Sequence, residues 1–132
     1  MALKDKRQTE KNHTFIQSLA HASHGVARIF KQEKNMRVHG GLAILVILLA
    51  IVLQISIFEW YWVLACIGGM LVTETFNTIS ENLVDLITGK TYSELGKHIK
   101  DMAAGGVLIC AIFSAVIGLC IFIPKIWNLI IH

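Results

Sequence analysis

The stretch Gly40–Phe58, GGLAILVILLAIVLQISIF, runs for 19 residues without a charged side chain. A helix of that length spans about 28 Å, close to the thickness of the hydrocarbon core of a bilayer. We therefore predict a first transmembrane helix over residues 40–58. A long polar leader precedes the stretch, which is also longer than the apolar segment of a signal peptide, so we do not expect a cleaved signal peptide.

The rest of the chain has the composition of a membrane protein. Hydrophobic residues make up 55% and charged residues 16%, whereas about 25% of a typical soluble domain is charged. A second uncharged stretch covers 102–123 and is followed by Pro124, and an apolar segment that starts at Trp60 is long enough to span if it continues to Ile87. The expected fold is all-α and integral to the membrane, with transmembrane helices at 40–58, 60–87 and 102–123.

Basic residues predict the orientation of these helices. Eight of the 12 Lys and Arg residues precede the first span, and the loop 88–101 carries Lys90, Lys97 and Lys100. Cytoplasmic segments of membrane proteins are enriched in Lys and Arg. We expect the N-terminus and the 88–101 loop in the cytoplasm, with the C-terminus outside.

Residues 1–37 form a leader within what we expect to be a single domain, 1–132. Met1–Asn12 is polar and charged, which is typical of disorder. Phe15–Phe30 has apolar residues at helical spacing between flanking basic residues. This pattern predicts an amphipathic helix on the cytoplasmic membrane surface or packed on the transmembrane bundle.

The second predicted span carries an unexpected polar stripe. Glu74, Asn77, Glu81 and Asp85 follow one another at spacings of 3, 4 and 4, which places them within an arc of about 80° on one helix face. An acidic residue inside a span costs about 2.5–3.5 kcal/mol. A polar seam between helices would need only neutral side chains, so we favour a cation-binding functional site.

Oxygen ligands without histidine favour Mg²⁺ over zinc, and Mg²⁺ is usually bound by one or two carboxylates together with substrate phosphates. The lysines of the 88–101 loop could bind such phosphates. The three cysteines, Cys66, Cys110 and Cys120, lie in apolar runs and suit core packing. Nothing in the sequence suggests a nucleic-acid partner.

The segment Glu74–Asp85, ETFNTISENLVD, resembles the E-x-x-N-[ST]-x-x-E-x-x-V-D signature of the prokaryotic diacylglycerol kinase family. The resemblance covers about residues 12–125 and includes Lys100–Gly105, KDMAAG, and Glu33 before the first span. It implies a homotrimeric, multi-pass lipid kinase of the bacterial plasma membrane that uses ATP and Mg²⁺, with its active site on the cytoplasmic side.

Glu33–His39, EKNMRVH, is similar to the E-x-N-x-R-x-H form of the Gram-positive branch of that family. Members of this branch mostly phosphorylate undecaprenol, which makes undecaprenol the first expected substrate and diacylglycerol the second. We also expect the acceptor chain to enter from the bilayer and to contact the apolar side of the first span formed by Leu42, Leu45, Leu49 and Val52.

The resemblance also implies roles for individual residues. Glu74 corresponds to the proposed general base, Glu33 and Glu81 to the metal-binding pair, and Asn77 to a supporting polar residue, with Asp85 as a further supporting residue on the stripe. The implied nucleotide-binding set is Glu33, Glu81, Thr91, Tyr92, Ser93, Lys100 and Asp101. His21, Thr14 and Ser93 depart from residues that the proteobacterial branch has at these places.

Two other classes of protein remain as alternatives. An ion- or proton-coupled transporter could use the acidic stripe as a relay, although transporters usually show repeats and broken helices, which this sequence lacks. A structural membrane subunit would leave the carboxylates without a purpose.

Overall fold

The computed structural model describes residues 15–131, and within them the chain is helical, without a strand. The described residues belong to two compact units, Met1–Gln32 and Glu33–His132. Residues 1–14 lie outside the description, and with them the expected disordered segment Met1–Asn12 and the departure at Thr14. All-α architecture is confirmed.

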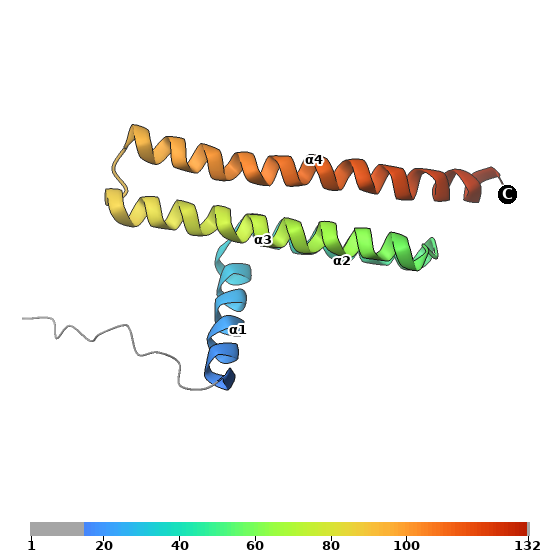
Figure 1. Cartoon of the computed structure of the whole chain (residues 1–132), viewed down its shortest axis with the longest axis horizontal. Coiled ribbons are helices and arrows are strands. Elements are labelled where there is room, and N and C mark those ends of the chain that lie inside the picture. The colour runs from blue at the N-terminus through green and yellow to red at the C-terminus, as the bar shows by residue number, and fades with distance from the viewer. Residues whose placement is uncertain (1–14, 132) are drawn as a thin grey trace, which may run out of the picture. The chain divides into compact units, whose positions relative to one another are not determined.

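The first unit contributes one described helix, α1 (Phe15–Gln32) (Figure 1). It covers the predicted helix and is two residues longer. Its apolar side chains remain exposed, at 81% for Phe15 and 59% for Val26. An apolar face at helical spacing that the helix's own unit does not cover suits contact with another apolar surface, such as a membrane.

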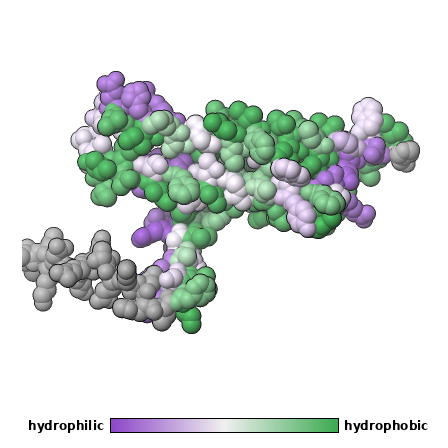
Figure 2. All heavy atoms as spheres, viewed as in Figure 1, coloured by the Kyte–Doolittle hydropathy of each residue, from purple (hydrophilic) through white to green (hydrophobic). Residues whose placement is uncertain are grey.

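The second unit contains α2 (Lys34–Val52), α3 (Ile57–Thr88) and α4 (Glu94–Ile131). The central helix, α3, packs against both α2 and α4. All three are long and apolar enough to cross a membrane. Figure 2 shows apolar residues over the middle of this unit and polar residues towards its two ends.

The first two long helices meet in a tight turn inside the predicted span 40–58. The helix α2 ends at Val52, Gln54 has a positive φ of 48°, and Ser56 caps α3. The Ser56 hydroxyl accepts from the Glu59 backbone N–H while the Glu59 carboxylate accepts from the Ser56 N–H, which is a capping box. An uncharged run therefore contains the end of one helix and the start of the next.

The last helix also differs from its expected bounds. It begins at Glu94, inside the expected loop 88–101, and continues through Pro124 to Ile131. Pro124, which follows the predicted span 102–123, therefore lies inside the helix. A proline removes only one backbone donor, and membrane helices tolerate this where neighbouring groups compensate.

A small apolar cluster holds the three helices together near the α2–α3 turn. Its buried members are Ala50, Ile55, Val63 and Ile121. An ion pair of 3.2 Å between Glu59 of α3 and Lys125 of α4 lies at this end of the unit. The opposite end is closed by the α3–α4 connection, where Gly96 approaches Val84 closely.

Candidate active site

The polar stripe of α3 begins in the interior of the unit and ends near its surface. Glu74, Asn77 and Thr78 are buried, with exposures of 2%, 5% and 6%. Glu81, two turns beyond Glu74, is exposed, and Asp85 is half-buried. Burying a carboxylate is expensive unless it has a partner or a function, so Glu74 is the residue of the stripe that most needs an explanation.

Asn77 links the buried and exposed parts of the stripe. Its Nδ2 donates a hydrogen bond of 3.3 Å to Oε1 of Glu81. Its Oδ1 is buried without a hydrogen-bond partner within residues 15–131. A buried acceptor without a donor costs about 1–3 kcal/mol, and a hydroxyl group brought next to Glu74 by a bound ligand could supply that donor.

A polar cavity of about 490 Å³ lies at the α3–α4 connection. It gathers six of the predicted site residues from three separate segments: Asp85, Thr91, Tyr92, Ser93, Lys100 and Asp101. The chain reverses here because α3 ends on Gly89 at φ 60°, in the left-handed conformation that glycine adopts readily. Lys90 and Lys97 also line the cavity, so its wall contains three lysines.

Lys100 of α4 is paired with Asp85 of α3 in this cavity. Lys100 Nζ lies 2.5 Å from Oδ1 of Asp85, and each side chain is 37% exposed. Lys90 and Lys97 form no ion pair with a residue of the described part of the chain. The cavity thus combines one fixed cation with two further cations, a suitable arrangement for a phosphate chain.

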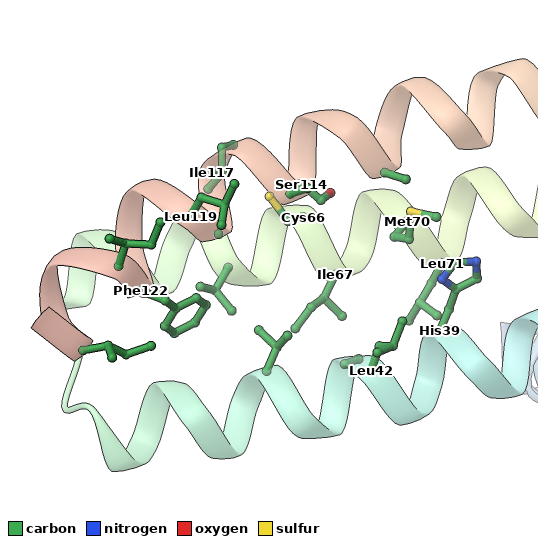
Figure 3. A pocket seen from close by; sticks show the side chains of 18 residues that line it. His39, Leu42, Cys66, Ile67, Met70, Leu71, Ser114, Ile117, Leu119 and Phe122 are labelled. Atoms are coloured by element: carbon green, nitrogen blue, oxygen red, sulfur yellow. The ribbon is translucent and has the colours of Figure 1, made fainter.

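A second cavity, of about 560 Å³, is apolar and lies over α3 between α2 and α4 (Figure 3). Its lining side chains that can form hydrogen bonds are His39, Cys66 and Ser114. Ser114 Oγ is buried without a hydrogen-bond partner in the described residues. In Figure 3, His39 and Leu71 lie towards one end of the cavity and Phe122 towards the other.

One of the four α2 residues expected to contact the acceptor chain lines this cavity. Leu42 lines it, together with Ala43 and Val46, whereas Leu45 and Val52 point outwards with exposures of 62% and 72%, and Leu49 is not in the lining. Helices α3 and α4 supply most of the wall, and the sequence of α2 alone does not show which of its sides they cover.

The buried part of the stripe lies between the two cavities along α3. The apolar cavity uses α3 residues from Val63 to Leu71, and the polar cavity uses α3 from Val84 onwards. Glu74 shares a face with Ile67 and Met70 and comes two turns after Ile67 and one turn after Met70. Eleven residues separate Glu74 from Asp85, which is about 16 Å along the helix.

The two predicted metal ligands do not form a closed metal site. Glu33 is the N-terminal cap residue of α2, and its side chain makes no capping hydrogen bond. Within residues 15–131, no group of three or more His, Cys, Asp or Glu is placed to hold a metal ion. These carboxylates fit Mg²⁺ only where substrate phosphates complete its coordination.

Some lining residues carry no signal in the sequence. Thr88 and Gly96 contribute to the polar cavity although neither was expected in the site. A β-carbon on Gly96 would lie 2.9 Å from Cγ1 of Val84, so glycine is required for this close approach of α4 to α3. In the sequence, Gly96 is one glycine in the expected loop 88–101, where glycine has many other uses.

Comparison with known proteins adds three matches. The sequence pattern of a family described as "Prokaryotic diacylglycerol kinase" matches residues 20–122. The "Undecaprenol kinase" of Bacillus subtilis is 40% identical over 112 residues, which cover 85% of this chain and 90% of that protein. The "Diacylglycerol kinase" of Synechocystis sp. is 32% identical over 114 residues, 86% of this chain and 65% of that protein.

Proposed function

The chain belongs to the prokaryotic diacylglycerol kinase family, and we propose that it transfers the γ-phosphoryl group of ATP to undecaprenol. The B. subtilis relative, which bears the name undecaprenol kinase, aligns over most of both chains. Lipid kinase chemistry gives a purpose both to the acidic stripe and to the adjacent lysine-lined cavity. A transporter or a structural subunit would leave that cavity without a purpose.

The observation that carries this proposal is the order of features along α3. An apolar cavity, a buried glutamate and a lysine-lined cavity follow one another on a single helix. A lipid alcohol has a long apolar chain and one reactive hydroxyl, whereas ATP has a polar base, a ribose and a phosphate chain. The two ends of α3 match these two substrates, and Glu74 lies where the hydroxyl and the γ-phosphate would meet.

In the proposed reaction, the hydroxyl oxygen of the lipid attacks the γ-phosphorus of ATP, and the bond from that phosphorus to the oxygen that bridges the β- and γ-phosphates breaks. Glu74 accepts the proton of the hydroxyl group. Asn77, one turn away, is the supporting polar residue of this proposal, and its Nδ2 donates a hydrogen bond to Glu81. Phosphoryl transfer depends mainly on positioning and on neutralising charge. Glu33 and Glu81 would hold Mg²⁺, which neutralises phosphate charge when it is bound with ATP.

The nucleotide is proposed to occupy the polar cavity. Lys100 and Asp101 at the start of α4 and the segment Thr91–Ser93 line it together. Glu33 and Glu81 complete the proposed nucleotide-binding set through the metal ion. The lysines favour phosphate through charge, since an ammonium group acts as a compact point charge with several donors.

Diacylglycerol is the second candidate acceptor. The Synechocystis relative is named diacylglycerol kinase, and Ser114 offers a hydroxyl inside the apolar cavity. Diacylglycerol brings two ester groups, and those left without a donor each cost about 1–3 kcal/mol. Because most of the cavity wall is apolar, undecaprenol remains the first choice.

The protein is further proposed to form a homotrimer in the bacterial plasma membrane, with the N-terminus and active site in the cytoplasm. The Lys and Arg bias of residues 1–37 and 88–101 supports this orientation. Glu81 is exposed on one copy, which supports coverage by another protomer, because a carboxylate facing lipid is costly. The mass of the protein in a detergent micelle, after subtraction of the detergent, tests the trimer against the 14.7 kDa of one chain.

Lipid phosphorylation by the purified protein tests the proposed activity. Protein in detergent micelles is incubated with γ-labelled ATP, Mg²⁺ and undecaprenol, and the organic phase is analysed for labelled lipid. We expect labelled undecaprenyl phosphate from the wild type and almost none from Glu74→Gln. An absence of labelled product with every lipid alcohol supplied would contradict the proposal.

A further inference from the structure

We infer that Asp85 is a positioning residue for phosphoryl transfer, which holds the ammonium group of Lys100 on the α3 side of the polar cavity. This inference rests on the proposed function, since it concerns the same site. It starts from the ion pair of 2.5 Å that joins Asp85 of α3 to Lys100 of α4. Both residues line the cavity assigned to the nucleotide.

The pair fixes the direction of a side chain that would otherwise be free to move. Lysine has a flexible four-carbon stem and an ammonium group with three donors. Asp85 accepts one of them, so two donors remain for phosphate oxygens. Asp85 follows Glu81 by one turn on the same face of α3. The fixed ammonium group therefore lies beside the part of α3 that leads to Glu81 and Glu74.

Helix pairing alone does not account for this ion pair. Near Lys100, the contact between Gly96 and Val84 already holds α4 against α3. The Asp85 and Lys100 side chains are each 37% exposed, and ion pairs exposed to this extent contribute little to stability.

The three lysines of the cavity differ in whether an acidic side chain already holds them. Lys90 and Lys97 have no ion-pair partner among the described residues and can adjust to a nucleotide as it binds. Only Lys100 is held in place before the nucleotide arrives. A group that is positioned in advance lowers the barrier of the chemical step more than it strengthens binding.

The test compares Asp85→Asn with Glu59→Gln in the lipid phosphorylation assay. Each variant breaks one ion pair between α3 and α4, and glutamine at 59 can still complete the capping box. We expect Asp85→Asn to lower kcat about tenfold or more while KM for Mg-ATP changes less than about threefold. Glu59→Gln should stay within about twofold of wild type in both constants, and Asp85→Glu, which keeps the charge, should recover part of kcat.

A double mutant separates positioning from stability. In a Lys100→Met background, Asp85→Asn should cause no further loss, because the residue that it positions is gone. A normal kcat for Asp85→Asn, a loss confined to KM, or an equal loss in the Lys100→Met background would each overturn the inference. If the wild type phosphorylates no lipid alcohol, the proposed function fails as well; an active wild type with a normal Asp85→Asn variant overturns the inference alone.

Discussion

Glu74 and Glu81 lie two turns apart on one face of α3, about 10 Å along the helix, and Glu74 is buried at 2% exposure while Glu81 is exposed. Two carboxylates of one stripe thus have different surroundings. The buried one adjoins the apolar cavity and the exposed one leads towards the polar cavity. This difference supports separate roles, a general base at Glu74 and a metal ligand at Glu81.

The base assignment predicts the behaviour of Glu74→Gln. The amide keeps the size of the side chain but cannot accept the proton, so phosphorylation should fall about 10²–10⁴-fold. Nucleotide binding should remain close to wild type, because Glu74 does not line the polar cavity. Binding of a fluorescent ATP analogue and lipid phosphorylation are measured on the same preparation. More than about a tenth of wild-type activity would remove Glu74 from this role.

The metal assignment predicts a different result for Glu33→Ala and Glu81→Ala. Each should raise the Mg²⁺ concentration needed for half-maximal activity and weaken ATP binding, because each removes a ligand from an ion that also contacts the phosphates. The measurement is activity as a function of Mg²⁺ at fixed ATP. Glu94→Gln, an exposed change outside the polar cavity, serves as the control. Unchanged Mg²⁺ dependence in both alanine variants would show that the pair is wrongly assigned.

Filling the apolar cavity should affect the lipid and not the nucleotide. Ala111 lines the cavity on α4, and Ala111→Phe places a ring in the space proposed for the acceptor chain. We expect KM for undecaprenol to rise about tenfold and KM for ATP to stay within about twofold. Ala104→Phe, on the same helix but exposed and outside the cavity, is the matched control. Equal effects of the two substitutions would argue against this location for the chain.

The close approach at Gly96 predicts a packing defect. In Gly96→Ala the new β-carbon would meet Val84 at 2.9 Å, and overpacking of this kind costs about 1–3 kcal/mol. Alanine in a helix gains up to about 1 kcal/mol over glycine, so the net change should be destabilising. At Gly105, where a β-carbon meets nothing within 4 Å, alanine should instead stabilise.

Thermal unfolding in detergent measures both glycine variants. The double mutant Gly96→Ala/Val84→Ala should recover part of the lost stability, since it removes the atom that the new methyl group meets. A Gly96→Ala protein as stable as Gly105→Ala would contradict the packing argument.

The sequence predicted the features that depend on local periodicity. Glu74, Asn77, Glu81 and Asp85 share a face because their spacing follows the helical repeat. The first and third predicted spans follow from uncharged length, and the second follows from an apolar segment that continues through the polar stripe. Neither inference needs knowledge of how the helices pack.

The features that the sequence could not predict depend on contacts between helices. The turn around Gln54 lies in an uncharged run, and lack of charge does not distinguish a turn from a helix. The ion pair between Asp85 and Lys100 joins residues 15 positions apart on two helices, and its existence depends on their register. The lining of the apolar cavity depends largely on α4, and the sequence of α2 alone does not show which of its residues face that cavity.

The choice of acceptor is the central claim, and one comparison tests it most directly. Undecaprenol and diacylglycerol are presented to the purified protein in the same mixed micelles, with Mg²⁺ and labelled ATP, and kcat/KM is measured for each. Because the apolar cavity offers few donors for ester groups, the account predicts at least about a tenfold preference for undecaprenol. Equal or higher kcat/KM with diacylglycerol would contradict the assignment of undecaprenol.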